Sequence, residues 1–590
     1  MFVATFLLGA VAVAVLSHPL WGKKGERGIT DVAPPTNPHT MFKYKHILAR
    51  AKGYYDIVVI GSGIGGLLLA ALLARLQNKK VLVLEQHTEV GGCMHRFSLP
   101  GNPDHEFESG VRFIGGLDPD MKVLLAAAAP NATWKPVPGT CYDQVAVNGK
   151  ITTRLYRGRR KWIGAVLSKA RGREERQQAL LAVREVEKAA NASRVAALLK
   201  VMPCCISRVA WRVMRLAEDV MGWRLAPYYS THTFNQVVAG APDACRRVMT
   251  AQSGNLGTEP GEAPAAVHAA MLKHFWTGAH TPDLRLLTQD LTATIAAAGG
   301  QVVTNARVER IVVVHGRARG VLVGRSGSTR RRFVGVEART AVVAANGLAN
   351  MVKLLAEDAP ESMRRIAGIV GPSACHVHLF VGLRGPCPGL SAANVWHHGG
   401  EDWAEAQRKH LGAVEPFGDD APPPSPVFIS SATAKRGEAG THLHPTVVLI
   451  AEARPEWFAT EDRDLKTRVC RRRLLEILYV YYPQTRGRVQ VAEVGTPLSS
   501  LKCLKYIGAR ESYGLSMRSG PRFGNAAVAQ ALRPKTSVPG LFLSGQDVAA
   551  SGLAGAMAGA ALCTHVLGRY GVPSRLGTGL VNAAQRATRA

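Results

Sequence analysis

Three closely spaced glycines separate a short apolar run from a stretch rich in alanine and leucine. The apolar run is 55–60 (YDIVVI), and the glycines are Gly61, Gly63 and Gly66. Gly61 permits a tight turn, Gly63 lets backbone approach a pyrophosphate, and Gly66 allows a helix and a strand to pack closely. A helix that begins here directs unpaired N–H groups and partial positive charge toward phosphate. The spacing therefore predicts a dinucleotide site.

An acidic residue follows the second predicted strand at the distance that such a site requires. Residues 81–84 (VLVL) are typical of a buried strand, and Glu85 follows them directly. Its carboxylate would accept hydrogen bonds from a ribose diol. A purely structural glycine turn is the alternative, but the order of strand, turn, helix (67–76), strand and acid favours nucleotide binding. The predicted cofactor-binding residues of this unit are Gly61, Ser62, Gly63, Gly65, Gly66, Glu85 and Gln86.

A second glycine pair follows the acid and bears on which dinucleotide is bound. Gly91 and Gly92 resemble the loop that wraps the diphosphate in the FAD-dependent amine oxidase and phytoene desaturase superfamily. Many members have arginine after the two glycines, whereas this chain has Cys93, and Arg96 is the candidate replacement. The resemblance implies FAD as the cofactor.

The far end of the chain carries a second, independent motif. Residues 539–547 (PGLFLSGQD) predict a turn, a buried strand and then an acid, and 552–567 predict an apolar helix. In the FAD family the matching aspartate lies near the ribityl chain and diphosphate, and the helix N-terminus faces the flavin. That N-terminus would stabilise the anionic reduced flavin by roughly 0.3–2 kcal/mol. We expect both motifs to enclose one cofactor, with Gly545, Asp547, Gly552 and Gly555 contributing from this end.

Nearly the whole chain resembles the retinol saturase family, with phytoene desaturases and carotenoid isomerases as more distant relatives. The segments that carry the resemblance are 81–97, 107–117, 455–458, 481–489, 538–548 and 552–563. Members are membrane-associated flavoproteins that act on polyene lipids. The resemblance implies FAD, NADPH or NADH as electron donor, a hydrophobic polyene lipid as substrate, and a location at a membrane surface, that of the endoplasmic reticulum.

One segment departs from the family pattern. Where the family has Tyr-Pro-Arg-Gly-Gly, residues 280–285 read HTPDLR: the proline is kept, but the aromatic residue, the arginine and both glycines of the pattern are missing. If this stretch shapes the substrate or flavin face, retinol itself is in doubt as the substrate, whereas the class of chemistry is less affected.

The elements that position these motifs predict an α/β fold: a Rossmann-type, amine-oxidase-like FAD-binding domain, discontinuous in sequence, with an inserted α+β substrate domain. Residues 301–314 predict two strands, with Val308 where the family's backbone contacts adenine, and 341–346 predict a strand that returns to the nucleotide domain. The expected boundaries are 54–150, 281–349 and 490–570 for the FAD domain, 151–280 and 350–489 for the substrate or lid domain, and 571–590 for a tail. The amphipathic stretch 171–223 is expected to be helical, either as core or as a lid or membrane-facing entrance for a lipid.

The N-terminus and the overall charge bear on location. Residues 1–20 lack charged side chains and would span about 30 Å as a helix. No positive charge precedes them, which favours a retained anchor over a cleaved signal within 1–22. The net charge is +30, but the basic residues are scattered and no nucleic-acid-binding motif is present. We therefore expect no nucleic-acid partner, and consider either a plain bias toward arginine or attraction to anionic lipid headgroups.

The expected chemistry is hydride transfer between flavin and a conjugated carbon–carbon double bond, for which an apolar tunnel suffices. The spacing of cysteines and histidines predicts no metal site, and the pattern identifies no catalytic residue. His268, His274, His376 and His378 could supply a proton, although each is more often structural. The alternatives are a redox-neutral carotenoid-type cis–trans isomerase, a flavin amine oxidase and a non-catalytic prenyl-binding protein of the same fold.

Overall fold

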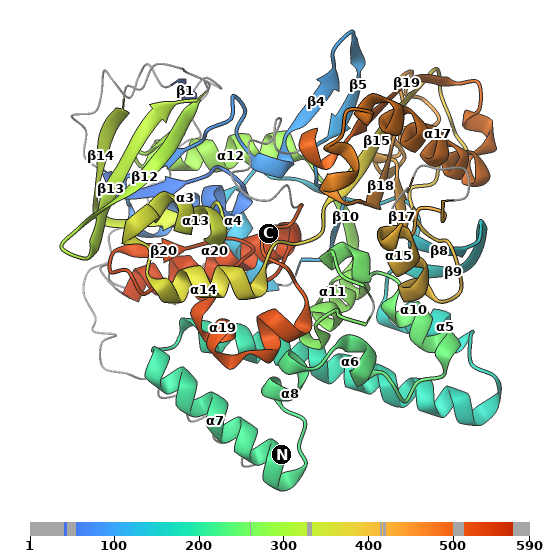
Figure 1. The fold of residues 1–590 in the computed structure, drawn as a ribbon, viewed down its shortest axis with the longest axis horizontal. Coiled ribbons are helices and arrows are strands. Elements are labelled where there is room, and N and C mark those ends of the chain that lie inside the picture. The colour runs from blue at the N-terminus through green and yellow to red at the C-terminus, as the bar shows by residue number, and fades with distance from the viewer. Residues whose placement is uncertain are drawn as a thin grey trace.

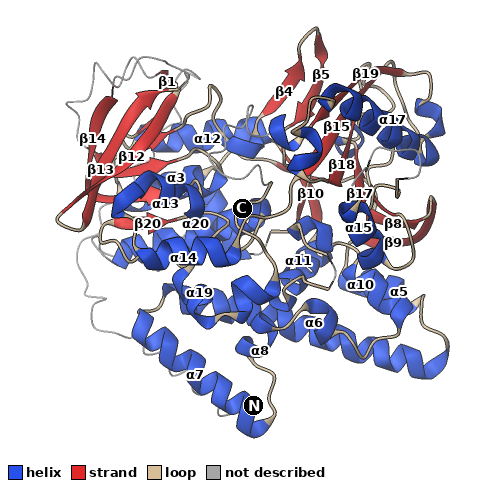
Figure 2. Ribbon diagram, in the orientation of Figure 1, coloured by secondary structure: helices blue, strands red, loops and turns tan. Residues whose placement is uncertain are grey.

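The structure is a computed structural model that describes residues 41–43, 55–117, 119–259, 261–326, 333–413, 416, 421–499 and 512–569. The predicted N-terminal anchor or signal (1–22) and the predicted tail (571–590) lie outside the described residues. Two large β-sheets lie at opposite sides of the molecule, with helices between and below them (Figure 1). Figure 2 shows most strands in the two upper corners and the helices concentrated in the lower half.

The first sheet has eight strands around a parallel core. Its order is β1 (Met41–Lys43), β11 (Gln301–Thr304), β3 (Val81–Leu84), β2 (Tyr55–Ile60), β14 (Phe333–Ala344), β13 (Arg317–Arg325) and β12 (Ala306–Val314), and β20 (Leu541–Leu543) also pairs with β14. The pairs β11–β3, β3–β2, β2–β14 and β14–β20 are parallel, and the β12–β13 hairpin joins β14 in antiparallel fashion. β2 and β3 consist mostly of buried Val, Ile and Leu, as expected of parallel strands covered on both faces.

Helices cover both faces of this sheet. The apolar cluster on one face is shared with α3 (Ile64–Gln77), α4 (Pro119–Ala128), α12 (Leu284–Ala297) and α20 (Gly552–Arg569). The other face packs against α13 (Leu348–Leu355), α14 (Glu361–Val370) and α19 (Ala526–Ala531). The strands and helices predicted around the two glycine motifs are all present, and the predicted Rossmann-type α/β fold is confirmed.

The second sheet has seven strands and is mainly antiparallel. Its order is β19 (Val489–Gly495), β15 (His376–Leu383), β18 (Thr446–Glu452), β17 (Val427–Ser430), β16 (Asn394–His398), β8 (Cys141–Val147) and β9 (Lys150–Tyr156). An apolar cluster on this sheet includes side chains of α17 (Arg463–Tyr481). The FAD-domain boundaries expected from the sequence, 54–150 and 490–570, include β8 and most of β19, but both strands pair within the second sheet. A strand's own residues do not specify its sheet, because pairing depends on distant partners.

A helical layer completes the molecule. It contains α5 (Arg159–Leu167), α6 (Gly172–Val201), α7 (Cys204–Met221), α8 (Ala226–Thr231), α9 (Phe234–Val237), α10 (Asp243–Thr250) and α11 (Ala265–Thr277). The amphipathic stretch predicted to be helical is thus two helices, separated at Pro203. α6 buries small and apolar side chains, whereas α7 extends along the lower edge of the molecule (Figure 1). In the described part of the chain, no helix is both long and apolar enough to cross a membrane.

The remaining elements are short. They are the β4–β5 hairpin (Arg96–Leu99 and Asn102–Glu108), a small sheet of β6 (Ile114–Gly115), β10 (Ala279–Pro282) and β7 (Trp134–Pro136), and the helices α15 (Trp403–Gly412) and α16 (Ala432–Lys435). β10 contains part of the segment that departs from the family pattern, and Asp283 caps the helix that follows by accepting a hydrogen bond from the Leu286 amide.

Candidate active site

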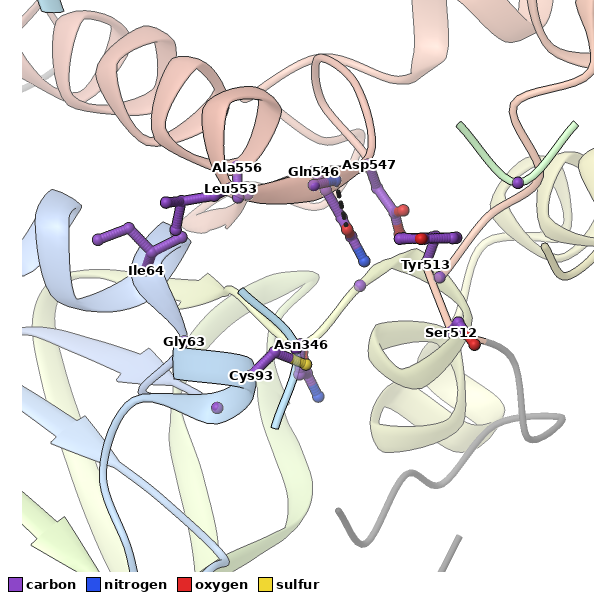
Figure 3. A pocket seen from close by; sticks show the side chains of 18 of the residues that line it. Gly63, Ile64, Cys93, Asn346, Ser512, Tyr513, Gln546, Asp547, Leu553 and Ala556 are labelled. Atoms are coloured by element: carbon purple, nitrogen blue, oxygen red, sulfur yellow. Dashed lines mark hydrogen bonds between the residues drawn. The ribbon is translucent and has the colours of Figure 1, made fainter. Parts of the chain in front are cut away.

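A cavity of about 580 Å³ lies at the carboxyl ends of β2, β3, β14 and β20. This is the edge of a parallel sheet at which ligands bind in open α/β folds. The close-up in Figure 3 shows Gly63 and Ile64 of the first motif facing Gln546, Asp547 and Leu553 of the second. The predicted cofactor residues that line the cavity are Gly61, Gly63, Gly65, Glu85, Gln86, Gly91, Gly92, Val308, Gly545, Asp547 and Gly552. The structure therefore brings the two motifs, which lie far apart in sequence, to one cavity.

The two motifs touch through their backbones. A Cβ atom on Gly65 would lie 2.6 Å from the Cα atom of Gly545, so only glycine allows this approach. The Ser544 hydroxyl donates a 2.8 Å hydrogen bond to the Gly65 carbonyl across the same contact. The amino-terminal turn of α3 is consequently fixed against the strand that precedes α20.

Glu85 is held in place by the glycine turn itself. One carboxylate oxygen accepts hydrogen bonds from the Ser62 amide (3.0 Å) and hydroxyl (2.6 Å), and the other accepts one from the His87 amide (2.8 Å). The Ser62 hydroxyl also accepts a hydrogen bond from the Gly91 amide (3.1 Å). Ser62 is thus buried beneath the cavity and does not line it; its side chain joins the acid to the second glycine pair.

Asp547, which follows β20, connects its own loop to two other segments on the first-sheet side of the cavity. Its two carboxylate oxygens accept hydrogen bonds from the amides of Leu348 (2.8 Å) and Leu515 (3.2 Å). The buried guanidinium of Arg522 donates to the carbonyls of Gln546 (3.2 Å) and Asp547 (2.8 Å). These bonds orient the loop that leads to the N-terminus of α20.

The glycines of the two motifs fall into two groups: those that leave space for a ligand and those that allow close backbone packing. A Cβ atom on Gly63 would meet no atom within 4 Å, and Gly63 lines the cavity, so the space beside it is available to a ligand. A Cβ atom on Gly66 would lie 2.1 Å from the Gly61 carbonyl oxygen, and one on Gly555 would lie 1.9 Å from that of Ala550. Gly66 and Gly555 do not line the cavity; they allow close packing.

Several polar atoms around the cavity lack a protein partner. They are Ser109 Oγ, Arg112 Nε and Nη2, Asn346 Oδ1 and Asn350 Oδ1, all buried. Buried polar groups without partners are costly, and a ligand with phosphates, hydroxyls and a polar ring would satisfy them. Together with the open space beside Gly63, these atoms fit FAD.

Arg112 is a buried cation on the cavity wall that the sequence analysis missed. Arg96, the candidate replacement, forms an ion pair with Glu106 (3.1 Å) and does not line the cavity, so that expectation was wrong. Arg112 is 6% exposed and lines the cavity, and burial lowers the pKa of its guanidinium, an effect opposed by Glu108. Its position within the family-like segment 107–117 was the available signal.

The second sheet supplies the other wall of the cavity. Part of this wall is apolar and consists of Trp396, Pro426, Phe428 and Ile450, with Phe113 beside them. The polar side chains of the same wall are His376, His378, Gln407 and Glu452. The Phe428 ring lies 4.8 Å from Trp396 and is nearly parallel to Phe113, at 6.3 Å between centroids. Flat apolar surfaces of this kind suit a flat, conjugated and hydrophobic ligand.

The four candidate histidines separate into two pairs. His376 and His378 line the cavity, whereas His268 and His274 do not. Burial lowers the pKa of His376 to about 4 and that of His378 well below its usual value. Both rings are therefore neutral near pH 7 and have no acidic imidazolium proton to give.

The departure from the family pattern lies elsewhere. None of residues 280–285 lines the cavity, since this stretch forms part of a small sheet and the start of α12. The missing aromatic residue and glycines therefore do not change the cavity wall.

The fold and the site define an FAD-dependent oxidoreductase. The NAD(P)-binding Rossmann-like domain family matches residues 59–128. The all-trans-retinol 13,14-reductase of Danio rerio is 27% identical and covers 89% of this chain and 88% of its own length; that of Rattus norvegicus is 25% identical and covers 95% and 96%. The predicted resemblance to retinol saturases is thus confirmed.

Solved structures agree at the level of the fold. A putrescine oxidase bound to putrescine has a TM-score of 0.54 and 15% identity to this chain, and the match covers 91% of this chain and 99% of that one. The match extends over most of both chains, so the two proteins share the overall fold. The low identity carries no information about the substrate.

The two groups of glycines predict different effects of alanine. Gly63→Ala is expected to weaken FAD binding at least tenfold with less than about 0.5 kcal/mol lost from the free energy of unfolding, because its methyl group enters the ligand's space. Gly66→Ala is expected to lose about 1–3 kcal/mol of stability, because its methyl group meets backbone. FAD titration by fluorescence and urea unfolding measure the two quantities.

The matched control is Gly164→Ala in α5, where a Cβ atom also meets nothing within 4 Å but lies outside the cavity. This variant should bind FAD as the wild type does. Unchanged FAD affinity of Gly63→Ala would show that the cofactor does not pass beside Gly63.

Proposed function

We propose that this protein saturates a carbon–carbon double bond of a retinoid- or carotenoid-like polyene lipid. The observation that carries the proposal is one cavity with two different walls: the nucleotide-type wall of the first sheet and the aromatic, apolar wall of the second. The similarity to all-trans-retinol 13,14-reductases supports the same chemistry. A redox-neutral isomerisation of a polyene is the second candidate, since the same apolar wall would accommodate it.

FAD would be held by the glycine turn with Glu85 and Gln86, by Gly91 and Gly92, by Val308, and by Gly545, Asp547 and Gly552. When bound and reduced, it supplies a hydride. The two glycine loops would bind the diphosphate through backbone N–H groups, and the N-termini of α3 and α20 add partial positive charge. NADPH or NADH is the proposed reductant of the flavin, on the strength of the similarity to reductases.

The second-sheet wall would orient the polyene. Trp396 is fixed because its indole N–H donates a 2.9 Å hydrogen bond to the buried carboxylate of Asp143. That carboxylate also accepts hydrogen bonds from Asn394 (2.6 Å) and Gln252 (2.5 Å). Asn394 and Trp396 lie on the same strand, β16, and Gln252 comes from a separate segment. The shared carboxylate ties the indole to both, so it would present a rigid apolar surface that positions the substrate and excludes water.

Mass spectrometry distinguishes the candidate reactions. Anaerobic incubation of the reduced holoenzyme with retinol or with an extracted carotenoid mixture is expected to yield a product heavier by two hydrogen atoms. An isomerase would change the retention time without changing the mass, and an amine oxidase would leave polyenes unchanged but release hydrogen peroxide from amines. Either result would replace the proposal, and protein that never binds flavin would favour a non-catalytic prenyl-binding role.

We further propose that the protein collects its lipid at an anionic membrane surface, with the endoplasmic reticulum as the expected location. The support comes from α7, whose outer face carries an apolar stripe at three- and four-residue spacing. The stripe consists of Ile206, Val209, Val213, Leu216 and Val220, which are 49–72% exposed. A helix that exposes such a stripe is typical of insertion into the headgroup region of a bilayer.

Charge and anchoring favour a bilayer as the occupant of this face. Arg208, Arg212 and Arg215 are exposed on the same helix, and the chain carries a net charge of +30, so a second copy is repelled and anionic headgroups are attracted. The inner face is held by Glu218, which accepts hydrogen bonds from the amides of Leu225 (3.0 Å) and Tyr228 (2.7 Å). The helix is thus fixed to the body with its apolar stripe outward.

Hydrogen–deuterium exchange of the full chain tests this surface. Vesicles containing phosphatidylserine are expected to slow exchange within 204–221 at least tenfold. Burial of only two apolar side chains of the stripe in the bilayer would contribute about 3–6 kcal/mol to the free energy of binding. The double variant Val213→Glu/Leu216→Glu should lose this protection. The control Leu443→Glu/Val480→Glu, which adds the same charge at exposed apolar positions elsewhere, should keep it.

Two outcomes would contradict the membrane proposal. One is unchanged exchange of 204–221 with vesicles present. The other is protection that needs no vesicles and grows with protein concentration, which would assign the stripe to self-association.

A further inference from the structure

Saturation of a double bond consumes a proton as well as a hydride, and the cavity contains one carboxyl group suited to give it. Among the residues that line the cavity, the carboxylic acids are Glu85, Asp547 and Glu452. Glu85 and Asp547 already accept hydrogen bonds from backbone amides on the nucleotide side. Glu452 lies instead on the wall formed by the second sheet.

The register of the second sheet places Glu452 beside the apolar wall. It is the last residue of β18, where it pairs with His376 of β15, and two residues earlier Ile450 pairs with His378. All four residues line the cavity. Two neighbouring strands therefore direct alternate side chains into the space proposed for the polyene, and Glu452 is the acidic member of that set.

The hydrogen bonds of Glu452 leave its carboxyl group without a cation. Its side chain accepts a hydrogen bond from the Gln407 amide of α15, which also lines the cavity, and its backbone carbonyl is 2.9 Å from His410 Nε2. Within the described residues, no lysine or arginine forms an ion pair with it. A neutral amide stabilises a buried carboxylate less than a cation would. The protonated form of Glu452 is therefore accessible, because no cation holds the side chain in its charged form.

Burial favours the protonated form of Glu452. It is the main cause that raises the pKa of Glu452 to about 7; the Gln407 hydrogen bond lowers this pKa, and the nearby Glu259 and Glu262 raise it. Arg518 acts in the opposite direction, but it is ion-paired with Glu262 at 2.8 Å. Tyr513, also on the cavity wall, is neutral because burial raises its pKa. The facing histidines, His376 and His410, are neutral because burial lowers the pKa of each to about 4.

We propose that Glu452 is the proton donor of the reductase reaction. This inference rests on the proposed function. Reduced FAD, when bound, would supply two electrons and one hydrogen to one carbon as a hydride. The neighbouring carbon takes the proton from the Glu452 carboxyl group, a carbon–hydrogen bond forms as the oxygen–hydrogen bond breaks, and the double bond becomes single. The resulting carboxylate regains a proton from solvent before the next turnover.

The Glu452→Gln variant tests the role because it keeps the shape and the amide contact but has no acidic proton. Reduction of the polyene by pre-reduced enzyme, measured in a single turnover, is expected to slow by about 10²–10⁴-fold. In the wild type this rate should fall as the pH rises through about 7, since the neutral acid is the donor, and in Glu452→Gln that dependence should vanish. Glu452→Asp should restore part of the rate and the pH dependence.

Two further measurements separate donation from structure. Reduction of the flavin by NADPH or NADH should be unchanged in Glu452→Gln, because that half-reaction needs no proton at the polyene. In the wild type, the infrared difference spectrum between pH 6 and pH 8 should contain carbonyl stretches of protonated carboxylic acids. Glu452→Gln should lose the component of Glu452 and keep that of the buried Asp143, whose pKa burial raises to about 6. The control Glu476→Gln removes an exposed carboxyl from α17 and should leave all three readouts unchanged.

The possible failures are distinguishable. Wild-type rate and wild-type pH dependence in Glu452→Gln would overturn the donor role and assign the proton to water while leaving the proposed function intact. A wild-type holoenzyme that reduces no polyene would overturn the proposed function and the donor role together. Identical carboxyl bands in the difference spectra of the wild type and Glu452→Gln would overturn the donor role whatever the activity.

Discussion

The close approach of two glycines is the contact on which the site depends. Gly65 lies in the first turn of α3 and Gly545 follows β20, and there is no room for a side chain between them. Because the glycine turn and the segment that contains Gly545, Asp547 and Gly552 meet here, any displacement would separate the two motifs that line the cavity. The hydrogen bond from Ser544 to the Gly65 carbonyl adds direction to a contact that packing alone would leave free to slide.

The two walls of the cavity are stabilised by different physical means. On the nucleotide side, Glu85 and Asp547 are carboxylates that accept several backbone hydrogen bonds each and thereby fix loops. On the apolar side, the buried carboxylate of Asp143 orients Trp396, and burial raises its pKa to about 6. Burying such a group is costly unless donors satisfy it, and three nearby donors do so. As a result, the Trp396 ring has one defined orientation on the cavity wall.

The parts of the site that the sequence predicted are those encoded locally. The strand, turn, helix and acid around Gly61 and Glu85 follow from residue types at fixed short spacing, so both the fold class and the nucleotide end were accessible. The position of Arg112 on the cavity wall was not, because Arg96 is much nearer the glycine pair in sequence and only the folded structure shows that Arg112 lines the cavity and Arg96 does not. Glu452 was also missed, since its chemistry arises from burial among residues that lie far away in sequence.

The order of elements along the chain has a consequence for how the protein acquires its cofactor. β20 and α20, which complete the cavity, are translated after every other described element. A polypeptide that ends before residue 541 lacks the β20 edge of the parallel sheet, the Asp547 carboxylate and the N-terminus of α20. The cavity is therefore complete only when residues 541–569 have been synthesised and have packed against the earlier segments.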